Sequence, residues 1–324
     1  EWLIDGMLEA NTFSMCFGSP AAGKTFLVLD MALCIASGKP FHERFVKQGP
    51  VFYIAGEGHN GFARRAAAWS KSHGIPLKGL PFFKSSRSIV LTEDESVAEL
   101  LDTVEAMVQQ HGDPQIIVVD TLARAMGAAD ENSTQAAGGF ISAVDEIRSH
   151  YDCTVLAVHH TGHAQKDRAR GSSALLGAVD AEFMVEKWFQ DDKCAKVEVK
   201  FTKMKDAKMP EPMNFVHAEI ELVGADGQKT SSVVLQHTAD TKPKPVTENA
   251  DGKQCLIDAL GQVIDNETRA VTKSELRDIY YKLSKSETDA AKKKAFDRAI
   301  NSCKADETIK VDNSMVYVIG DIGT

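Results

Sequence analysis

The sequence predicts an α/β protein whose mostly parallel sheet is extended by antiparallel strands and followed by a small C-terminal domain. Short apolar segments alternate with amphipathic segments of helical period over the first part of the chain. This alternation is typical of βαβ units and a parallel sheet. From Ala181 onward, strand-like segments follow one another directly, and beyond residue 252 three helical segments and a hairpin end the chain.

The elements of the first part follow from their apolar spacing. Strands buried on both faces read as continuous apolar runs, and four such runs are present: residues 13–17, 50–55, 115–120 and 154–159. Between them lie segments with helical spacing, residues 24–37, 62–73, 97–110 and 140–150. We expect four later segments to be antiparallel additions to the sheet: residues 182–187, 195–201, 214–222 and 231–236.

The chain is expected to divide into a core over residues 1–237, a linker over 238–252 and a C-terminal domain over 253–324. The linker is polar and contains Pro243 and Pro245. In the last domain, residues 253–264, 272–283 and 289–303 have helical spacing, and a hairpin is expected to turn at Asp312 and Asn313. This order is typical of a winged helix.

Composition narrows the functional classes. The hydrophobic share of 43% and charged share of 26% are ordinary for a globular protein, which excludes collagen-like, disordered and coiled-coil chains. The net charge of −9 argues against binding nucleic acid over the whole surface, although a local basic groove remains compatible with it. No apolar run is long enough to span a membrane, and the unpaired spacing of the six cysteines favours a reduced, cytoplasmic setting.

A glycine-rich loop follows the first strand and precedes the first helix. Its residues match the pattern G-x-x-x-x-G-K-[ST]: Gly18, Ser19, Pro20, Ala21, Ala22, Gly23, Lys24 and Thr25, with Phe26 next in the helix. Backbone N–H groups of such a loop wrap phosphates, and the helix N-terminus favours negative charge. We therefore expect ATP here, with Lys24 on the β- and γ-phosphates and Thr25 on Mg²⁺. The alternative is a glycine-rich turn with a chance lysine.

Two carboxylates are candidates for metal binding and catalysis. Asp120 ends the apolar run 116–119, at the sheet edge where ligands bind in open α/β folds, and is expected to bind Mg²⁺ beside Thr25. The alternative is that it caps the next segment. The next residue is Thr121 rather than an acid, so the catalytic base is expected elsewhere. Glu57, between Gly56 and Gly58 after the second strand, is our candidate; otherwise it is a turn residue.

These segments together resemble the RecA-like hexameric ATPases of the plasmid RepA helicase type, which are related to DnaB-type helicases. The matching segments are Trp2-Leu3-Ile4, GSPAAGKT, VFYIAGEG, IIVVDTLAR, VLAVHHTGH and RGSSAL. The resemblance implies a RecA-like fold, Mg-ATP hydrolysis, a ring with ATP at subunit interfaces, and single-stranded DNA in the channel. It also places the catalytic glutamate after the second strand, in agreement with Glu57.

The resemblance further implies a polar residue that senses the γ-phosphate at the end of strand 154–159. Our first choice is His160. Two alternatives stay open at this point: a zinc site made by His159, His160 and His163, and a buried structural histidine.

In related rings a Lys-x-Arg pair acts on the nucleotide of a neighbouring subunit. Here Lys203 and Lys205 stand in its place, and lysine lacks the bidentate geometry of arginine. Arg170 competes with them for this role, and a solvated strand face is the remaining alternative for the lysines.

Two basic regions are candidates for nucleic acid. Lys166, Arg168 and Arg170 lie in the loop 161–173, where they would contact single-stranded DNA through its phosphates; a disordered surface loop is the alternative. In the C-terminal domain, the helix 289–303 carries four cations against Asp297: Lys292, Lys293, Lys294 and Arg298. It suits duplex DNA or, equally, a protein partner.

The leading functional hypothesis is an ATP-dependent DNA helicase or translocase in phage, prophage or plasmid replication. It would form a ring, expected to be a hexamer, with a primase or replication-initiation proteins as candidate partners. The alternative is an oligomeric ATPase that loads or remodels DNA or protein without unwinding. A nucleotide switch without turnover and a small-molecule kinase are further options; the poised carboxylate of Glu57 argues against a switch.

Overall fold

The structure is a computed structural model that describes residues 1–56, 59–162, 168–190, 194–224, 227–241, 248–264, 268–284 and 288–319. The chain divides into two compact units, Glu1–Lys242 and Pro243–Thr324. Among the described helices, none combines the length and apolarity that a membrane span requires.

A nine-stranded sheet runs through the first unit in the order β11-β10-β9-β8-β3-β7-β6-β4-β5. Its strands are β3 (Phe13–Gly18), β4 (Val51–Ala55), β5 (Phe82–Lys84), β6 (Ile116–Asp120), β7 (Thr154–His160), β8 (Ala181–Gln190), β9 (Cys194–Met204), β10 (Met213–Val223) and β11 (Lys229–His237). Strands β9 to β11 are antiparallel, as predicted. The expectation was wrong for β8, which pairs with β3 in parallel, because a half-buried strand has the same side-chain pattern in either direction.

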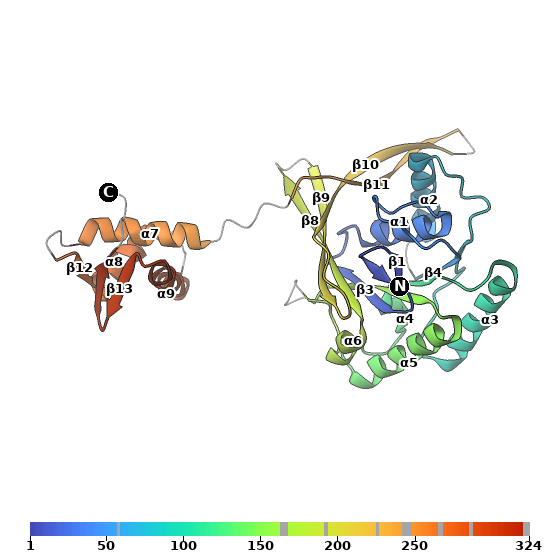
Figure 1. Cartoon of the computed structure of the whole chain (residues 1–324), viewed down its shortest axis with the longest axis horizontal. Helices are drawn as coiled ribbons and strands as arrows, with labels where there is room; N and C mark the ends of the chain where they lie inside the picture. The colour runs from blue at the N-terminus through green and yellow to red at the C-terminus, as the bar shows by residue number, and fades with distance from the viewer. Residues whose placement is uncertain are drawn as a thin grey trace. The chain divides into compact units, whose positions relative to one another are not determined.

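Two helical layers cover the faces of this sheet (Figure 1). On one face α1 (Lys24–Ser37) and α2 (His59–His73) pack in one apolar cluster. On the other, α3 (Asp94–His111) and α5 (Thr134–Tyr151) pack in a second cluster, next to the short helices α4 (Leu122–Ala125) and α6 (Ser173–Ala178). The residues of β6 alternate between the clusters: Ile116 and Val118 face the first, Ile117 and Val119 the second.

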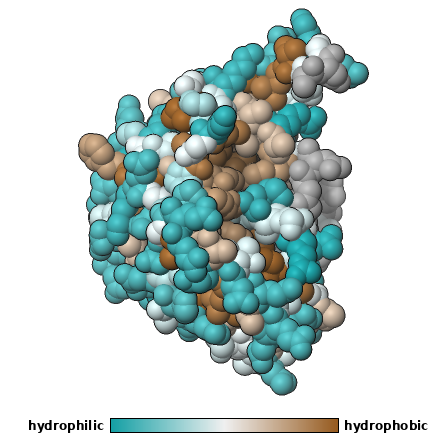
Figure 2. Space-filling view, turned by 90° about the vertical axis from the view of Figure 1, so that its right-hand side faces the viewer, coloured by the Kyte–Doolittle hydropathy of each residue, from teal (hydrophilic) through white to brown (hydrophobic). Residues whose placement is uncertain are grey.

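The α/β class with a mostly parallel sheet extended by antiparallel strands is therefore confirmed. A two-stranded ribbon, β1 (Trp2–Ile4) and β2 (Leu8–Glu9), precedes the sheet and contributes Leu3, Ile4 and Leu8 to the first cluster. Figure 2 shows the face of the molecule that lies to the right in Figure 1. This face is largely hydrophilic, and its apolar side chains gather in the upper half.

The second unit has three helices and a three-stranded antiparallel sheet. In chain order these are α7 (Glu248–Val263), β12 (Ala270–Thr272), α8 (Lys273–Leu283), α9 (Asp289–Ala305), β13 (Ile309–Asp312) and β14 (Met315–Val318), with sheet order β12-β14-β13. Thr272 and Glu275 form the capping box expected at the start of α8. Helix α7 begins at Glu248, inside the stretch that we expect to be a linker. The helices and strands enclose their own apolar core.

Candidate nucleotide site

The glycine-rich loop joins the end of β3 to the start of α1. Gly23 precedes the helix with φ 104°, a conformation that favours glycine. Lys24 is 6% exposed and its Nζ donates to the carbonyls of Gly18, at 2.8 Å, and Ser19, at 2.9 Å. The first turn of α1 has no side-chain cap and no acidic residue. A helix N-terminus whose N–H groups have no side-chain cap, and which lies beside a lysine ammonium, can bind a phosphate group.

The loop lies directly against the antiparallel extension of the sheet. A Cβ atom at Gly18 would come within 2.1 Å of the Val185 carbonyl oxygen in β8, and one at Gly23 within 3.3 Å of Val197 in β9. A side chain at Gly18 would therefore clash with the backbone of β8, and at Gly23 the positive φ and the tight approach to Val197 both disfavour one. The glycines of the motif serve close packing as well as phosphate approach.

Asp120 lies at the carboxyl end of β6 and is 6% exposed. The hydroxyl of Tyr53, in β4, donates to its Oδ2 at 2.7 Å. Burial, and after it the charge of Asp120, holds the pKa of Tyr53 well above its usual value, so the phenol stays protonated and continues to donate. Sequence analysis missed Tyr53; the signal available was one hydroxyl-bearing residue in the otherwise apolar strand Val51–Ala55.

The charges of Lys24 and Asp120 both act on one buried group, the thiol of Cys16 in β3. Burial raises its pKa most, Lys24 lowers it, and Asp120 raises it. Lys24, at the start of α1, and Asp120, at the end of β6, thus both lie within electrostatic range of the Cys16 thiol. A carboxylate and the hydroxyl of Thr25 are the oxygen ligands that Mg²⁺ prefers, so these residues fit the metal of a bound nucleotide.

Glu57, the predicted catalytic base, lies outside the described residues. The residue before it is held at the same edge of the sheet, because the Gly56 N–H donates to the Asp120 carbonyl at 2.6 Å. A Cβ atom at Gly56 would meet the Arg124 Cβ at 2.7 Å. The chain thus passes the end of β6 before it reaches Glu57, whose role stays a prediction.

The two histidines at the end of β7 have different surroundings. The ring of His160 has Nδ1 3.4 Å from the Nζ of Lys24. His159 is fully buried, and its Nε2 donates to the Arg170 carbonyl at 2.8 Å. Burial lowers the pKa of His159 to about 4, so its ring is neutral. His159 is the buried structural histidine, and His160 lies at the candidate site.

The zinc alternative has no support within the described ranges, where no group of three or more His, Cys, Asp or Glu is placed to hold a metal ion. His163 lies outside those ranges.

The loop after β7 is tied to both histidines and to the phosphate loop. Thr161 N–H donates to the Gly18 carbonyl at 3.3 Å, and Arg170 N–H donates to the His160 carbonyl at 3.0 Å. A bridge between Thr161 and Ala169 closes the base of the loop. Of the predicted DNA-binding cations, Arg168 is exposed and Arg170 is ion-paired with Glu131, while Lys166 lies outside the described residues.

Residues 1–166 match the model of a family described as AAA domain, which is just over half of the 324-residue chain. The chain belongs to this family.

Two solved structures are similar to this AAA domain protein. One is a KaiC-like protein of the hyperthermophilic archaeon Pyrococcus horikoshii OT3, 15% identical, with a TM-score of 0.44 over 72% of this chain and 93% of that chain. The other is the RadB recombinase, 15% identical, with a TM-score of 0.47 over 64% of this chain and 87% of that chain. No curated protein sequence matches the chain. Family membership and the geometry of the loop agree on nucleotide binding.

In the AAA domain protein, Lys203 and Lys205 lie near the amino end of β3, whereas the phosphate loop follows its carboxyl end. Lys203 pairs with Glu182 at the start of β8, which lies beside the first half of β3. Its Nζ donates to the Leu176 carbonyl at 2.8 Å, and burial foremost, then Lys205, lowers its pKa. The structure does not bring these lysines to the nucleotide site of their own chain.

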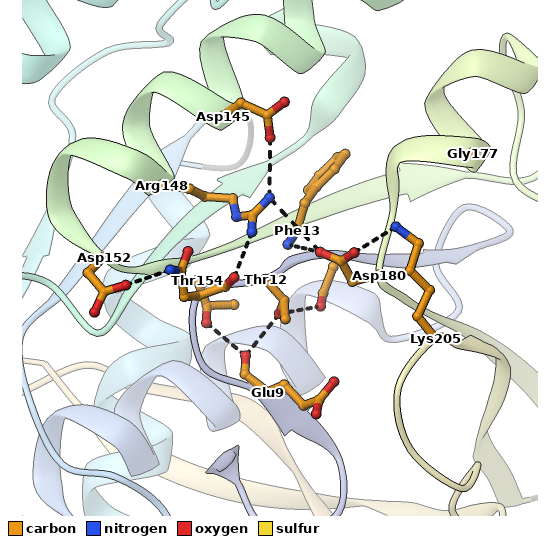
Figure 3. A network of polar contacts seen from close by, with 12 residues as sticks. Glu9, Thr12, Phe13, Asp145, Arg148, Asp152, Thr154, Gly177, Asp180 and Lys205 are labelled. Atoms are coloured by element: carbon orange, nitrogen blue, oxygen red, sulfur yellow. Dashed lines mark hydrogen bonds and ion pairs between the residues drawn. The ribbon is translucent and has the colours of Figure 1, made fainter. Parts of the chain in front are cut away.

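Lys205 belongs to the network in Figure 3, at the amino end of β3. Its Nζ is 2.8 Å from Asp180 Oδ1. The other carboxylate oxygen of Asp180 accepts from the Phe13 N–H at 2.9 Å and lies 4.0 Å from Arg148. Asp180 thus joins the start of β3 to α5 and to the segment after β9.

A further cation that sequence analysis missed lies beside the start of α1. The guanidinium carbon of Arg65, in α2, lies 5.1 Å from the ring centroid of Phe26. Its charge also lowers the pKa of Tyr53. The same Phe26 ring also lies near the ring of His217, in β10, with 6.0 Å between the two ring centroids. Arg65 therefore adds positive charge near the start of α1 and to the surroundings of Tyr53.

Proposed function

We propose that the chain is an ATP-dependent DNA helicase or translocase of the plasmid RepA type, acting on single-stranded DNA in phage, prophage or plasmid replication. The observation that supports it is the double attachment of His160. Its ring contacts Lys24 of the phosphate loop, and its carbonyl accepts from Arg170 at the base of the basic loop. A change at the terminal phosphate would thereby be transmitted to the cations that face DNA.

The residues of the chain have separate tasks in hydrolysis. Lys24 binds the β- and γ-phosphates, and Thr25 with Asp120 holds Mg²⁺, which neutralises charge on the phosphates. Glu57 accepts a proton from the attacking water. His160, whose Nδ1 is within reach of Lys24, detects the presence of the γ-phosphate. Tyr53 keeps the carboxylate of Asp120 in place by its hydrogen bond.

Positive charge on the transferred phosphoryl group would come from another copy of the chain, through Lys203 and Lys205. These lysines are remote from the phosphate loop of their own chain, so they would have to serve a neighbouring subunit. Arg170 and Lys205 are each paired with an acid of their own chain, Glu131 and Asp180, so Arg170 stays a second candidate for this action in trans. Action in trans requires a ring, which we propose to be a hexamer; the apolar side chains gathered in Figure 2 support an interface between copies.

The C-terminal unit fits a winged-helix-like domain, since its elements occur in the order helix, strand, helix, helix, strand, strand. A primase or replication-initiation proteins are candidate partners of the ring, which would act in the cytoplasm.

The deciding experiment measures ATP hydrolysis with and without single-stranded DNA, on protein whose mass is measured by light scattering. We expect a ring whose hydrolysis is stimulated by DNA and which displaces a strand from a forked duplex. Lys24→Ala should abolish nucleotide binding or turnover. Stimulated hydrolysis without strand displacement would instead favour an ATPase that loads or remodels, and a strict monomer with nucleotide and DNA present would refute the proposal.

Glu57→Gln tests the base. It should retain ATP binding and lower the hydrolysis rate by at least about 10²-fold, whereas the exposed Glu105→Gln on α3 should be neutral. A normal rate in Glu57→Gln would assign the base to another residue.

Replacing Lys166, Arg168 and Arg170 together by alanine tests the loop. The variant should bind single-stranded DNA more weakly and with a flatter salt dependence. Alanines at three exposed lysines on other elements, Lys78, Lys208 and Lys229, serve as the charge-matched control. An unaltered salt slope in the loop variant would place the DNA site elsewhere.

A further inference from the structure

We propose that the C-terminal unit carries a second nucleic-acid site, in which the outer face of α9 binds duplex DNA. This goes beyond the proposed function, which concerns single-stranded DNA at the core. The sequence leaves duplex DNA and a protein partner open for this helix, and the structure distinguishes them by which side chains are buried and which are paired.

Helix α9 has one buried face and one polar face. Phe296, Ala299, Ile300 and Cys303 are buried in the core of the unit. At 100° per residue, the positions opposite that face are Lys294, Arg298 and Asn301, all exposed. The remaining positions of this outer face are alanines, Ala290, Ala291 and Ala305, whose small side chains allow close approach of a surface to the helix.

The cations of this face are available to a ligand. In the part of the chain that the structure describes, neither Lys294 nor Arg298 has an ion-pair partner. The acid on this helix nearest to them, Asp297, lies 3.7 Å from the Nζ of Lys273 in α8, so its charge is offset within the unit. Lys293 and Lys304 are exposed along the same side as Asp297. The face is therefore positive although the whole chain is acidic.

The hairpin that follows α9 carries a further exposed cation. Thr308 N–H, at its start, donates to the Cys303 carbonyl at the end of α9. Lys310 in β13 and Tyr317 in β14 are paired across the hairpin, and both are exposed. The tip carries the exposed Asp312, so the positive charge of the hairpin lies at Lys310 rather than at its tip.

Duplex DNA fits this surface better than a protein does. The cores of protein interfaces are depleted in lysine and enriched in aromatic and apolar residues, whereas the outer face of α9 offers cations, an amide and alanines. A single α-helix fits the major groove, where arginine pairs with guanine and asparagine with adenine. Over the 17 residues of α9, Lys294 and Arg298 lie about 6 Å apart along the axis, which suits neighbouring phosphates or base edges.

The test measures binding of the full chain, without nucleotide, to a 20-base-pair blunt duplex of mixed sequence by fluorescence anisotropy between 50 and 200 mM salt. Lys294→Ala/Arg298→Ala should bind at least about tenfold more weakly at 50 mM salt, and its log–log salt slope should be flatter by about 1.8, the value for two phosphate contacts. Arg277→Ala/Lys282→Ala removes the same charge from α8 of the same unit and should retain most of the binding.

Two further measurements keep the outcome decisive. Lys294→Arg should bind like the parent, and thermal unfolding of each variant should show an intact C-terminal unit. Equal loss in the α8 and α9 variants, unchanged binding in the α9 variant, or no duplex binding by the parent at 50 mM salt would each overturn the proposal. Since no nucleotide is present, failure of ATP hydrolysis or of strand displacement would leave this result unaffected.

Discussion

Replacing Tyr53 by phenylalanine removes one hydroxyl from the candidate metal site and little else. The ring is fully buried, and its centroid lies 5.0 Å from that of Phe62 and 6.1 Å from that of Phe82. These contacts do not involve the hydroxyl. The change therefore isolates the hydrogen bond that Asp120 Oδ2 accepts at 2.7 Å.

Two effects of known size are expected from Tyr53→Phe. A hydrogen bond to a charged group stabilises a protein by about 1.5–3 kcal/mol, and Asp120 is too buried for water to replace the phenol freely. A loss of about 2 kcal/mol lowers the Tm of a unit of this size by about 4–8 °C. Because the hydroxyl also orients a predicted Mg²⁺ ligand, the apparent affinity for Mg²⁺ should fall by about 10–100-fold.

The assay titrates Mg²⁺ against ATP hydrolysis and, separately, records thermal unfolding without nucleotide. Tyr151→Phe is the matched control: its hydroxyl is bonded to the Leu101 carbonyl at 2.9 Å, in the other apolar cluster. That variant should lose about 0.5–1.5 kcal/mol of stability and keep its Mg²⁺ dependence. If Tyr53→Phe matched Tyr151→Phe in both measurements, Tyr53 would have no role in holding the metal ligand.

Three other predictions follow from the same region. His160→Ala should retain nucleotide binding but lose stimulation of hydrolysis by single-stranded DNA; stimulation equal to the parent's would separate His160 from the DNA loop. The pKa of His159 is about 4, against an ordinary value of 6.5. As the pH falls below 6.5, His159 is therefore protonated in the unfolded chain while it stays neutral in the folded protein. Stability should therefore decrease by up to about 3 kcal/mol between pH 6.5 and pH 4, and less in His159→Gln; parallel urea-unfolding profiles for the two proteins would contradict this. Asp180→Ala should lower the free energy of unfolding by about 1–3 kcal/mol, since the buried Phe13 N–H loses its acceptor, whereas Lys205→Ala should change it by less than about 1 kcal/mol.

Much of the core could be predicted from its sequence because the signals are local. Runs such as Ile116–Val119 contain no polar residue, which is expected for a strand covered on both faces. The phosphate loop is likewise a contiguous motif. Strand direction is not local, because the side-chain pattern of β8 is compatible with either, and pairing with β3 decided it.

The partners of the site residues could not be predicted, since they are distant in sequence. Tyr53 and Asp120 are 67 residues apart, and nothing near either one indicates the other. His159 and His160 are adjacent in sequence, yet neighbouring residues of a strand point to opposite faces. The strand pattern alone does not tell which of them meets Lys24; the resemblance pointed to His160, and its Nδ1 lies 3.4 Å from the Nζ of Lys24. Arg170 was predicted to be available, but Glu131, from a loop without regular pattern, pairs with it.

The contact of Gly18 with β8 and of Gly23 with β9 sets the smallest fragment that can work. A piece cut where the family match ends, at residue 166, would keep the whole glycine-rich motif and yet lack the strands on which that motif rests. The fragment would lack Val185 and Val197, so the glycine-rich loop would no longer pack against β8 and β9. Anyone shortening this protein to obtain a minimal ATP binder should therefore retain the chain at least through Met204, where β9, the second of these strands, ends.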